Sequence, residues 1–396
     1  MIYNFDERID RKNNNAAKFE EAYLHFGSND VIPLWIADMD FKTAQPIIDA
    51  VRERAEQGIF GYTSRPEEYF KLIAKWQQRQ NGYLPDVNKM AFAPGVIPAM
   101  RMILNLFTQE NDKILIQYPV YHPFTDLVQN SSRRIVPSRL IFEHGRYTMD
   151  YDDFEEKAKN GVKYFLLCNP HNPVGRCWSR EELKRVGDIC VKYNIKVISD
   201  EIHSDLMLFG NKHTVFASIS DEIASLTTTC IAPSKTFNLA GLQSSTIIFP
   251  NTVCKEAYET QLKAMDIARN NCFSLVATMA AYEHGEEWLT QLKRYLEGNM
   301  RFIGDYCREN IPFFKPNLPE CTYLCWIDAR DTGMTDDELF DFTVRKAKVA
   351  CSMGVQFGKG GEGFLRLNAA CPRSTLEDAL GRIKAAAADN PILCKK

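Results

Sequence analysis

The sequence predicts an α/β fold: a three-layer large domain, in which helices cover both faces of a mostly parallel sheet, followed by a smaller α+β domain. The first observation is that short apolar runs ending in polar or turn residues alternate with helical patterns over most of the chain. Such alternation is typical of parallel strands joined by crossover helices. The second observation is that this regular alternation ends at about Trp288, after which strand and helix patterns are mixed.

The predicted strands of the large domain are apolar on both faces, as strands between two helix layers are. They are KILIQ (113–117), KYFLLCN (163–169), IKVISDE (195–201), TTTCIAPSK (227–235) and SSTIIF (244–249). Helices are predicted over 96–107 and 179–194. The second opens with Ser179 as N-cap and Glu182 three residues later, which is the spacing of a capping box.

The C-terminal third predicts a separate, smaller unit. Its expected elements are a helix at 287–310, a strand at 322–329, a helix at 335–349, a strand at 364–370 and a final helix. We therefore expect an N-terminal segment (1–40) that packs with the small domain, a large domain (41–286) and the small domain itself (287–396).

Composition and charge narrow the class of protein. The chain has 396 residues, of which 45% are hydrophobic and 25% charged, with a net charge of −3. That length suffices for two domains with sizeable cores. The charge gives no electrostatic reason to expect a nucleic acid or an acidic membrane as partner.

The N-terminal stretch, the length of the apolar runs and the cysteines predict a cytoplasmic protein without a metal site. The N-terminal stretch MIYNFDERIDRKNNN is polar, unlike a signal peptide, and the apolar runs are shorter than a membrane span. The 12 cysteines form no Cys-x-x-Cys pair, and none stands at zinc-finger spacing from a histidine. Several, such as Cys168 and Cys230, lie in apolar runs, which is typical of small buried side chains in a reducing compartment.

One motif invites a nucleotide-binding interpretation that its context does not support. The stretch GKGGEG (358–363) satisfies G-x-G-x-x-G, but a dinucleotide fingerprint follows a strand and opens a helix. Here the next residues, FLRLNAA, alternate as a strand does. We interpret the motif as a flexible turn before a strand.

A stronger signal is spread over three predicted strand ends. Asn169 and Asn172 follow the first, Asp200 and His203 the second, and Ser234 and Lys235 the third. Because ligands of parallel sheets bind outside the carboxyl ends of the strands, these groups are expected to share a crevice.

The combination suits an aldehyde cofactor, pyridoxal phosphate. A lysine amine such as that of Lys235 can form a Schiff base with the aldehyde, and a buried carboxylate such as Asp200 can keep the ring nitrogen protonated. Asn172 could bond the ring hydroxyl with His203 close by. The phosphate needs backbone N–H groups at a helix start and hydroxyls, and the ring needs an aromatic partner; the candidates are Gly95, Val96, Ile97 and Ser234, with Tyr118 or Tyr121.

Each residue alone has a simpler explanation. Asp200 could cap a helix, Tyr121 could be core packing, and most lysines are solvated charges. The conjunction of amide, carboxylate and lysine at neighbouring strand ends favours the cofactor interpretation.

With these residues assembled, the sequence resembles the pyridoxal-phosphate-dependent enzymes of fold type I, the aspartate-aminotransferase-like class I/II superfamily. The motifs NPHNPVGR, SDEIHSD, SKTFNLAGLQ and FLRLNAACPR occur in the expected order over essentially the whole chain. Within that superfamily, IPLWIADMDF (32–41) and GYTS (61–64) are similar to signatures of the MalY/PatB-type cystathionine β-lyase and cysteine-S-conjugate β-lyase group.

The resemblance implies a role for each residue of the predicted site. Lys235 would carry the cofactor and then move the substrate proton. The positions implied for the cofactor ring are Asp200, Asn172, His203 and Tyr121, and those for its phosphate are Gly95, Val96, Ile97 and Ser234. The substrate α-carboxylate would be bound by Arg366, whose planar fork suits a carboxylate, near the backbone of Ala37. Tyr62 would reach the phosphate of the neighbouring subunit, which implies a homodimer with shared active sites.

The reaction itself is left open by the residues. β-Elimination and transamination use the same lysine and the same aspartate, so both a lyase and an aminotransferase fit. Gln243 stands where many aminotransferases place a phosphate-binding arginine, eight residues after their lysine, which agrees with the lyase group. The resemblance implies a carbon–sulfur β-lyase that converts L-cystathionine or another cysteine S-conjugate to a thiol, pyruvate and ammonia. A non-catalytic role on the same fold is disfavoured by the intact Lys235, Asp200 and Arg366.

Overall fold

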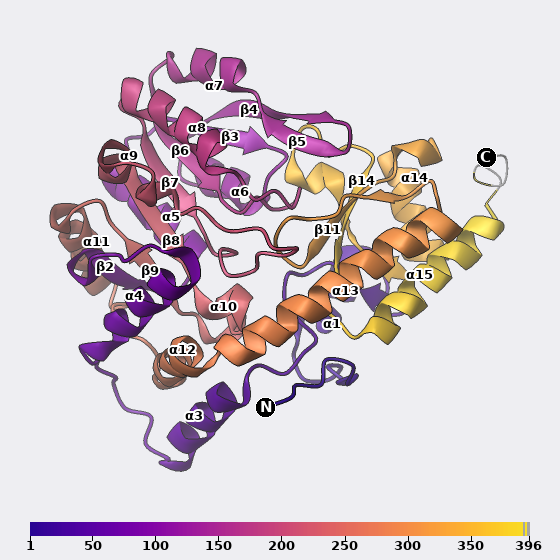
Figure 1. Cartoon of the computed structure of the whole chain (residues 1–396), viewed down its shortest axis with the longest axis horizontal. Helices are drawn as coiled ribbons and strands as arrows, with labels where there is room; N and C mark the ends of the chain where they lie inside the picture. Colours follow the sequence, from indigo (N-terminus) through magenta and orange to yellow (C-terminus); the bar gives the residue numbers. More distant parts are fainter. Residues whose placement is uncertain (391–392, 394–396) are drawn as a thin grey trace.

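A computed structural model describes residues 1–390 and Leu393 (Figure 1). Its large sheet has eight strands in the order β2-β9-β8-β7-β6-β3-β4-β5. They are β2 (Met90–Ala93), β3 (Lys113–Tyr118), β4 (Arg134–Glu143), β5 (Arg146–Met149), β6 (Val162–Cys168), β7 (Lys196–Asp200), β8 (Thr227–Ile231) and β9 (Ser245–Ile248). Parallel pairing joins β4, β3, β6, β7 and β8. The predicted α/β class with a mostly parallel sheet is confirmed.

The edges of the sheet depart from a purely parallel arrangement. β9 pairs antiparallel with both of its neighbours, and β5 pairs antiparallel with β4. The sequence run at 244–249 does not reveal this direction, because β9 is buried along its whole length just as its parallel-paired neighbour β8 is.

The carboxyl ends of three central strands are in register. Cys168, which ends β6, lies opposite Asp200, which ends β7, and Asp200 lies opposite Cys230 of β8. The chain segments that leave these strands therefore start from one edge of the sheet, where ligands of such sheets bind.

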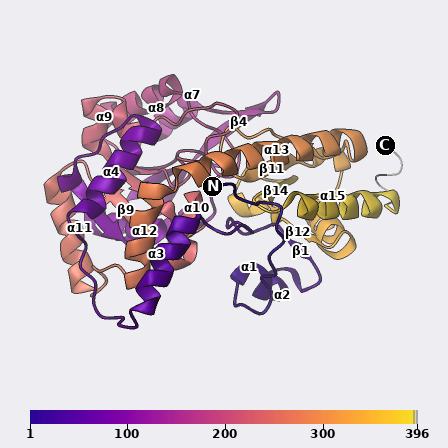
Figure 2. The same cartoon turned by 60° about the horizontal axis from the view of Figure 1, so that its bottom comes forward.

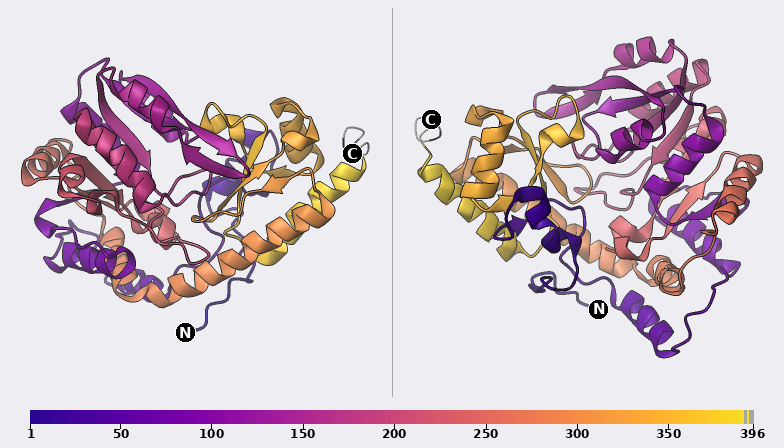
Figure 3. Two further views of the ribbon diagram at one scale, coloured as in Figure 1. Left: turned by 45° about the horizontal axis from the view of Figure 1, so that its top comes forward. Right: turned by 180° about the vertical axis from the view of Figure 1, so that it is seen from behind.

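Helices cover both faces of the large sheet, each with its own core (Figure 3). One face is covered by α5 (Val96–Phe107), α6 (Pro123–Gln129) and α11 (Thr252–Ala264), the other by α7 (Tyr151–Ala158), α8 (Arg180–Lys192) and α9 (Asp221–Leu226). The predicted capping box of α8 is confirmed, since Ser179 and Glu182 each bond the other's backbone N–H.

A second, four-stranded antiparallel sheet lies beside the first. Its order is β10 (Lys315–Pro316), β11 (Leu324–Asp328), β14 (Phe364–Asn368), β13 (Ser352–Met353). The long helix α13 (Glu286–Asn310) extends from the part of the molecule that contains the eight-stranded sheet to this four-stranded sheet. It packs with α15 (Arg373–Ala388) (Figure 1).

The predicted helix at 335–349 is too long. The structure has α14 (Asp336–Phe340), a π-helical turn over Asp341–Lys346, and then strand β12 (Val349–Ala350). Lys348 has a φ of +56°, which ends the helical path. Val349, the last residue of the predicted helix, and Ala350 instead pair with the N-terminal strand.

The N-terminal segment lies against this C-terminal part (Figure 2). Strand β1 (Ile32–Pro33) pairs in parallel with β12. Before it come α1 (Ala17–Glu20) and α2 (Ala22–Phe26), and the side chain of Phe26 packs with Val344 and Ala350. The division at residues 40 and 286 stays a prediction.

The remaining helices form a third group. They are α3 (Gln45–Glu56), α4 (Glu68–Asn81) and α12 (Cys272–His284), with α12 in contact with both others. Between α3 and α4 an extended segment, residues 57–65, exposes the side chains of Ile59, Phe60 and Tyr62. Within residues 1–390, no helix is both long and apolar enough to cross a membrane.

Candidate active site

Lys235 lies on a short helix just beyond the end of β8. This helix, α10 (Pro233–Thr236), is held by the hydroxyl of Thr236, which donates a 2.8 Å bond to the buried Asp205. The amine of Lys235 donates a 2.7 Å bond to the carbonyl oxygen of Ala37. The lysine therefore points into the molecule, toward a segment 198 residues earlier in the chain.

Two hollows meet at Lys235. The inner cavity has a volume of about 220 Å³ and the outer cleft of about 1040 Å³, and Ala37, Tyr121 and Lys235 line both. The inner cavity brings together ten of the predicted residues, namely Ala37, Gly95, Val96, Ile97, Tyr121, Asn172, Asp200, His203, Ser234 and Lys235. Arg366 lines the outer cleft, and Tyr62 lines neither.

The inner cavity holds a carboxyl group and an amine in a poorly solvated place. Burial raises the pKa of Asp200 to about 7, against the pull of the positive charge of Lys235. Burial lowers the pKa of Lys235 to about 8, aided by Arg366 and opposed by Asp38 and Asp200. A cation facing Asp200 would favour its ionised form, and the backbone N–H of Ile202 already donates a 3.1 Å bond to its Oδ1.

His203 offers an unpaired ring nitrogen to the same cavity. Its side chain is buried, and Nδ1 has no hydrogen-bond partner among the described residues. Burial, together with the positive charges of Lys235 and Arg366, lowers the pKa of His203 to about 3, so the imidazole is neutral. Buried polar atoms are normally hydrogen-bonded, so this one marks a place for a ligand atom.

The start of α5 forms one end of the inner cavity. Gly95 precedes the helix in an extended conformation, and a Cβ added to it would lie 3.2 Å from Cδ of Pro98. The first N–H groups of a helix have no partner within it and bind anions well, so the amides of Val96 and Ile97 suit a phosphate. Ser234 and Gln243 also line this cavity. Position 243 therefore places a neutral amide here and not the positive charge of an arginine.

Of the two candidate aromatic residues, only Tyr121 lines the inner cavity. Its backbone N–H donates to the carbonyl of Asn172 at 3.0 Å, which fixes it beside the amide. Tyr118 lines the outer cleft, and its hydroxyl shares a 2.7 Å bond with Thr125. Tyr121, and not Tyr118, is therefore placed where it could contact a ring in the inner cavity.

The G-x-G-x-x-G stretch is a turn before a strand, as predicted. Gly358, Gly360 and Gly363 have positive φ, and β14 starts at Phe364. A Cβ at Gly358 would lie 2.2 Å from the ring of Tyr118. The glycine there allows a close approach to the cleft wall.

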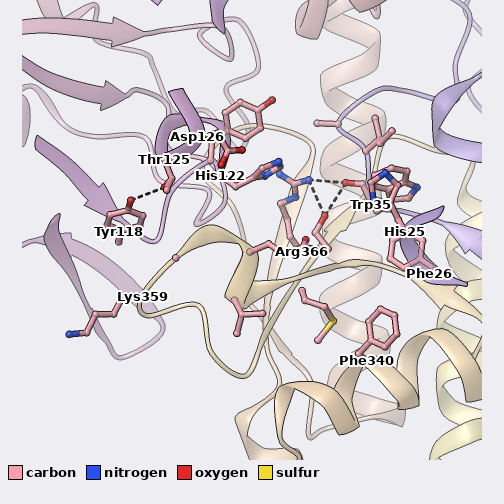
Figure 4. A pocket seen from close by; sticks show the side chains of 18 of the residues that line it. His25, Phe26, Trp35, Tyr118, His122, Thr125, Asp126, Phe340, Lys359 and Arg366 are labelled. Atoms are coloured by element: carbon pink, nitrogen blue, oxygen red, sulfur yellow. Dashed lines mark hydrogen bonds between the residues drawn. The ribbon is translucent and has the colours of Figure 1, made fainter. Parts of the chain in front are cut away.

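Arg366 lies in the middle of β14 and faces the outer cleft (Figure 4). Its Nη2 donates to the carbonyl of Trp35 at 2.8 Å and to the hydroxyl of Ser352 at 3.2 Å, and its Nη1 donates to Oδ1 of Asn172 at 3.1 Å. Because a guanidinium has five N–H donors, some remain for a substrate. Burial lowers the pKa of Arg366 to about 10, so it is charged at neutral pH.

The wall of the outer cleft opposite the glycine turn is aromatic. His25 and Phe26 of α2 lie against Trp35, with ring centroids 4.5 and 5.4 Å away, and Phe340 stacks on Phe26 at 6.3 Å (Figure 4). All four residues line the cleft. This wall suits an apolar or flat substituent.

Tyr62 lies away from both hollows of its own chain. Its side chain is 97% exposed, and the guanidinium of Arg269 lies over its ring at 6.0 Å. Arg269 also donates to the carbonyl of Thr63 at 3.0 Å, which ties the extended segment 57–65 to the body.

Several contact residues were not found from the sequence. Tyr323 donates its hydroxyl to the carbonyl of Ala37 at 2.9 Å, beside Lys235, and nothing in its apolar surroundings distinguishes it from a core tyrosine. Ser352 is the register partner of Arg366 across β13 and β14, which becomes visible only once the sheet is known. Asn368, which bonds the carbonyls of residues 36 and 38, follows Arg366 by two positions and so shares its face of the strand.

The comparisons with known proteins agree with this geometry. Cystathionine beta-lyase PatB of Bacillus subtilis is 42% identical over 384 residues, covering 97% of this chain and 99% of PatB. A PLP-bound putative aminotransferase of Clostridium difficile 630 superposes with a TM-score of 0.96 at 50% identity, covering 97% of this chain and all of the other. A PLP-bound C-S lyase of Staphylococcus hominis gives 0.91 at 34% identity and covers 98% of each chain. The model of the aminotransferase class I and II family matches residues 29–383, and the chain belongs to that family.

Proposed function

We propose that this protein is a pyridoxal-phosphate-dependent carbon–sulfur β-lyase that cleaves L-cystathionine or another cysteine S-conjugate. The observation that carries the proposal is the placement of Lys235, Asp200 and Arg366 around two adjoining hollows. They occur in a chain similar over nearly its full length to a cystathionine beta-lyase.

The inner cavity fits the cofactor by the chemistry of its groups. Lys235 would hold the aldehyde carbon, Asp200 the ring nitrogen, and Asn172 and His203 the ring oxygen. Tyr121 would lie on the ring. The phosphate would accept bonds from the start of α5 (Val96–Phe107) and from the hydroxyl of Ser234.

The chain's own residues orient the substrate and move its proton. When bound, pyridoxal phosphate supplies an aldehyde that joins the substrate amine and a ring that accepts the electron pair left on Cα. Arg366 holds the substrate α-carboxylate with its unused N–H groups, near the backbone of Ala37. Lys235, freed by the substrate, takes the Cα proton; its pKa of about 8 lies near neutral pH, where a base works best.

Loss of the leaving group completes the elimination. The Cβ–S bond breaks with its electron pair on sulfur, which leaves as a thiolate and takes up a proton. The remaining three-carbon fragment takes up one water to give pyruvate and ammonia. With cystathionine the thiol is homocysteine.

An aminotransferase is the second candidate, because the similar C. difficile structure is described as a putative aminotransferase. Transamination would need Lys235 to return the proton to the cofactor side rather than let the β-substituent leave. Gln243 in the inner cavity, in place of an arginine, is in accord with the lyase assignment.

The proposal includes a homodimer in the cytoplasm. Ile59, Phe60 and Tyr62 are 74%, 60% and 97% exposed on one extended segment. Clustered apolar side chains of this kind mark protein contacts. In a dimer, Tyr62 would reach the phosphate bound by the partner subunit.

Borohydride trapping tests the cofactor assignment directly. The purified protein should be yellow, and reduction should leave a cofactor adduct on the peptide that contains Lys235. A colourless protein that cannot be reconstituted, or an adduct elsewhere, would exclude the proposed site.

A further inference from the structure

Residues 34–40, which we call the strap, pass both Lys235 and Arg366, and side chains bond every carbonyl from Trp35 to Met39. The carbonyl of Trp35 accepts from Arg366 at 2.8 Å, and that of Ala37 accepts from Lys235 at 2.7 Å. Asn368 bonds the carbonyls of Ile36 and Asp38, and Arg11 and Asn238 bond that of Met39. The strap is thus a common partner of the base and the carboxylate-binding residue.

Two cations from the N-terminal segment hold the strap's carboxylates. Arg11 bonds Asp38 at 2.6 Å and Asp40 at 2.7 Å. The amine of Lys18, whose side chain is fully buried, donates to Asp40 at 2.9 Å and lies 3.4 Å from Asp38. Each carboxylate therefore faces both cations, in a closed cluster of four charges.

The cluster is bound to its surroundings as a unit. The attraction of Asp40 and Asp38 outweighs the desolvation of Lys18 and raises its pKa, so the ammonium form persists. The carbonyl of Lys18 accepts a 3.0 Å bond from the indole of Trp35, on the strap itself. A buried charge deprived of its partner is strongly unfavourable, so loss of either cation should release the strap.

We propose that Arg11 and Lys18 are positioning residues for the reaction. By fixing Asp38 and Asp40 they hold the strap so that its carbonyls orient the amine of Lys235 and the guanidinium of Arg366. Neither cation lines the inner cavity or the outer cleft, so their effect on the reaction passes through the strap. This inference rests on the proposed function, because that function gives Lys235 and Arg366 their roles as base and carboxylate ligand.

The test compares Lys18→Met with Lys42→Met. Lys42 makes a 2.7 Å ion pair with Glu7 just beyond the strap, but both side chains are largely exposed. In the cofactor-free protein, hydrogen exchange of the peptide covering residues 34–41 should be faster in Lys18→Met and unchanged in Lys42→Met. In the cofactor-loaded protein, KM should rise about tenfold or more, because a displaced Arg366 would bind the substrate more weakly. The fall in kcat should be smaller, because Lys235 would be less well oriented but still present.

A second variant covers the case in which Lys18→Met does not fold. Arg11→Gln keeps Lys18 between both carboxylates and removes a partly exposed cation, so it should fold and show the same two changes more weakly. Wild-type exchange in the strap and wild-type KM in every variant that folds would overturn the proposal. Failure of the proposed function would look different, since the wild-type protein would then bind no cofactor or release no thiol.

Discussion

Arg366 and Asn172 share a 3.1 Å hydrogen bond, from Nη1 of the guanidinium to Oδ1 of the amide. Asn172 lines the inner cavity and Arg366 the outer cleft. With its oxygen occupied by the guanidinium, the amide can present its NH₂ to a ring oxygen. The bond therefore joins the proposed carboxylate-binding group to the proposed cofactor position.

This bond makes Arg366→Lys an informative change. A lysine cannot bond Trp35, Ser352 and Asn172 together and still offer a planar fork. Hydrogen bonds to charged groups contribute about 1.5–3 kcal/mol each, so kcat/KM should fall about ten- to a hundredfold, mainly through KM. Steady-state pyruvate release measures it. Arg330→Lys changes a largely exposed arginine that pairs with Asp328 and is the control; equal kinetics in the two variants would remove Arg366 from the substrate site.

Asp200→Asn should retain the cofactor but lose most of the activity. The amide keeps the shape of the carboxylate without the charge that would hold a proton on the ring nitrogen. Loss of such an electrostatic contribution costs kcat at least about a hundredfold. Borohydride should still trap the adduct on Lys235, whereas the exposed control Asp188→Asn should be fully active. Near-normal turnover by Asp200→Asn would contradict the assignment.

Cofactor uptake should depend on pH through the amine of Lys235. Only the neutral amine attacks the aldehyde. Because the pKa of Lys235 in the folded protein is lowered to about 8, the rate of reconstitution should rise with pH below 8 and level off above it. Stopped-flow absorbance of the cofactor-free protein mixed with pyridoxal phosphate measures the profile. A midpoint near the ordinary lysine value of 10.5 would show that the amine is not desolvated.

Gly358→Ala should destabilise the fold. Its φ is +90°, and the added Cβ would lie 2.2 Å from the ring of Tyr118. A strained backbone position costs on the order of 1–3 kcal/mol. Gly304→Ala, within α13 and with no neighbouring atom within 4 Å, should instead stabilise by roughly 0.5–1 kcal/mol. Urea unfolding compares the two, and a Gly358→Ala protein as stable as the wild type would be inconsistent with the packing described.

The residues of the inner cavity could be predicted from the sequence better than those of the outer cleft. Asp200 and Lys235 follow apolar runs, and the rule that parallel strands present their carboxyl ends at one edge predicts their meeting. Arg366 came only from the family resemblance, because a single arginine in an alternating strand is not distinctive. The roles of all these residues stay predictions.

The strap could not be predicted. Its contacts are made by backbone carbonyls of residues 35–39 with side chains from three separate parts of the chain, which contain Arg11, then Lys235 and Asn238, then Arg366 and Asn368. A carbonyl has no sequence signature. The predicted end of the helix at 335–349 is wrong for a related reason. Pairing with β1 decides the conformation of Val349 and Ala350, and the periodicity of residues 335–349 contains no information about that partner.

The most direct test of β-elimination is to incubate the cofactor-loaded protein with L-cystathionine, with and without an added 2-oxo acid. Pyruvate, ammonia and homocysteine should appear in equal amounts at the same rate in both mixtures, and Lys235→Ala should produce none of them. Turnover that occurs only with the 2-oxo acid, and that matches its conversion to an amino acid, would contradict the lyase assignment and identify an aminotransferase.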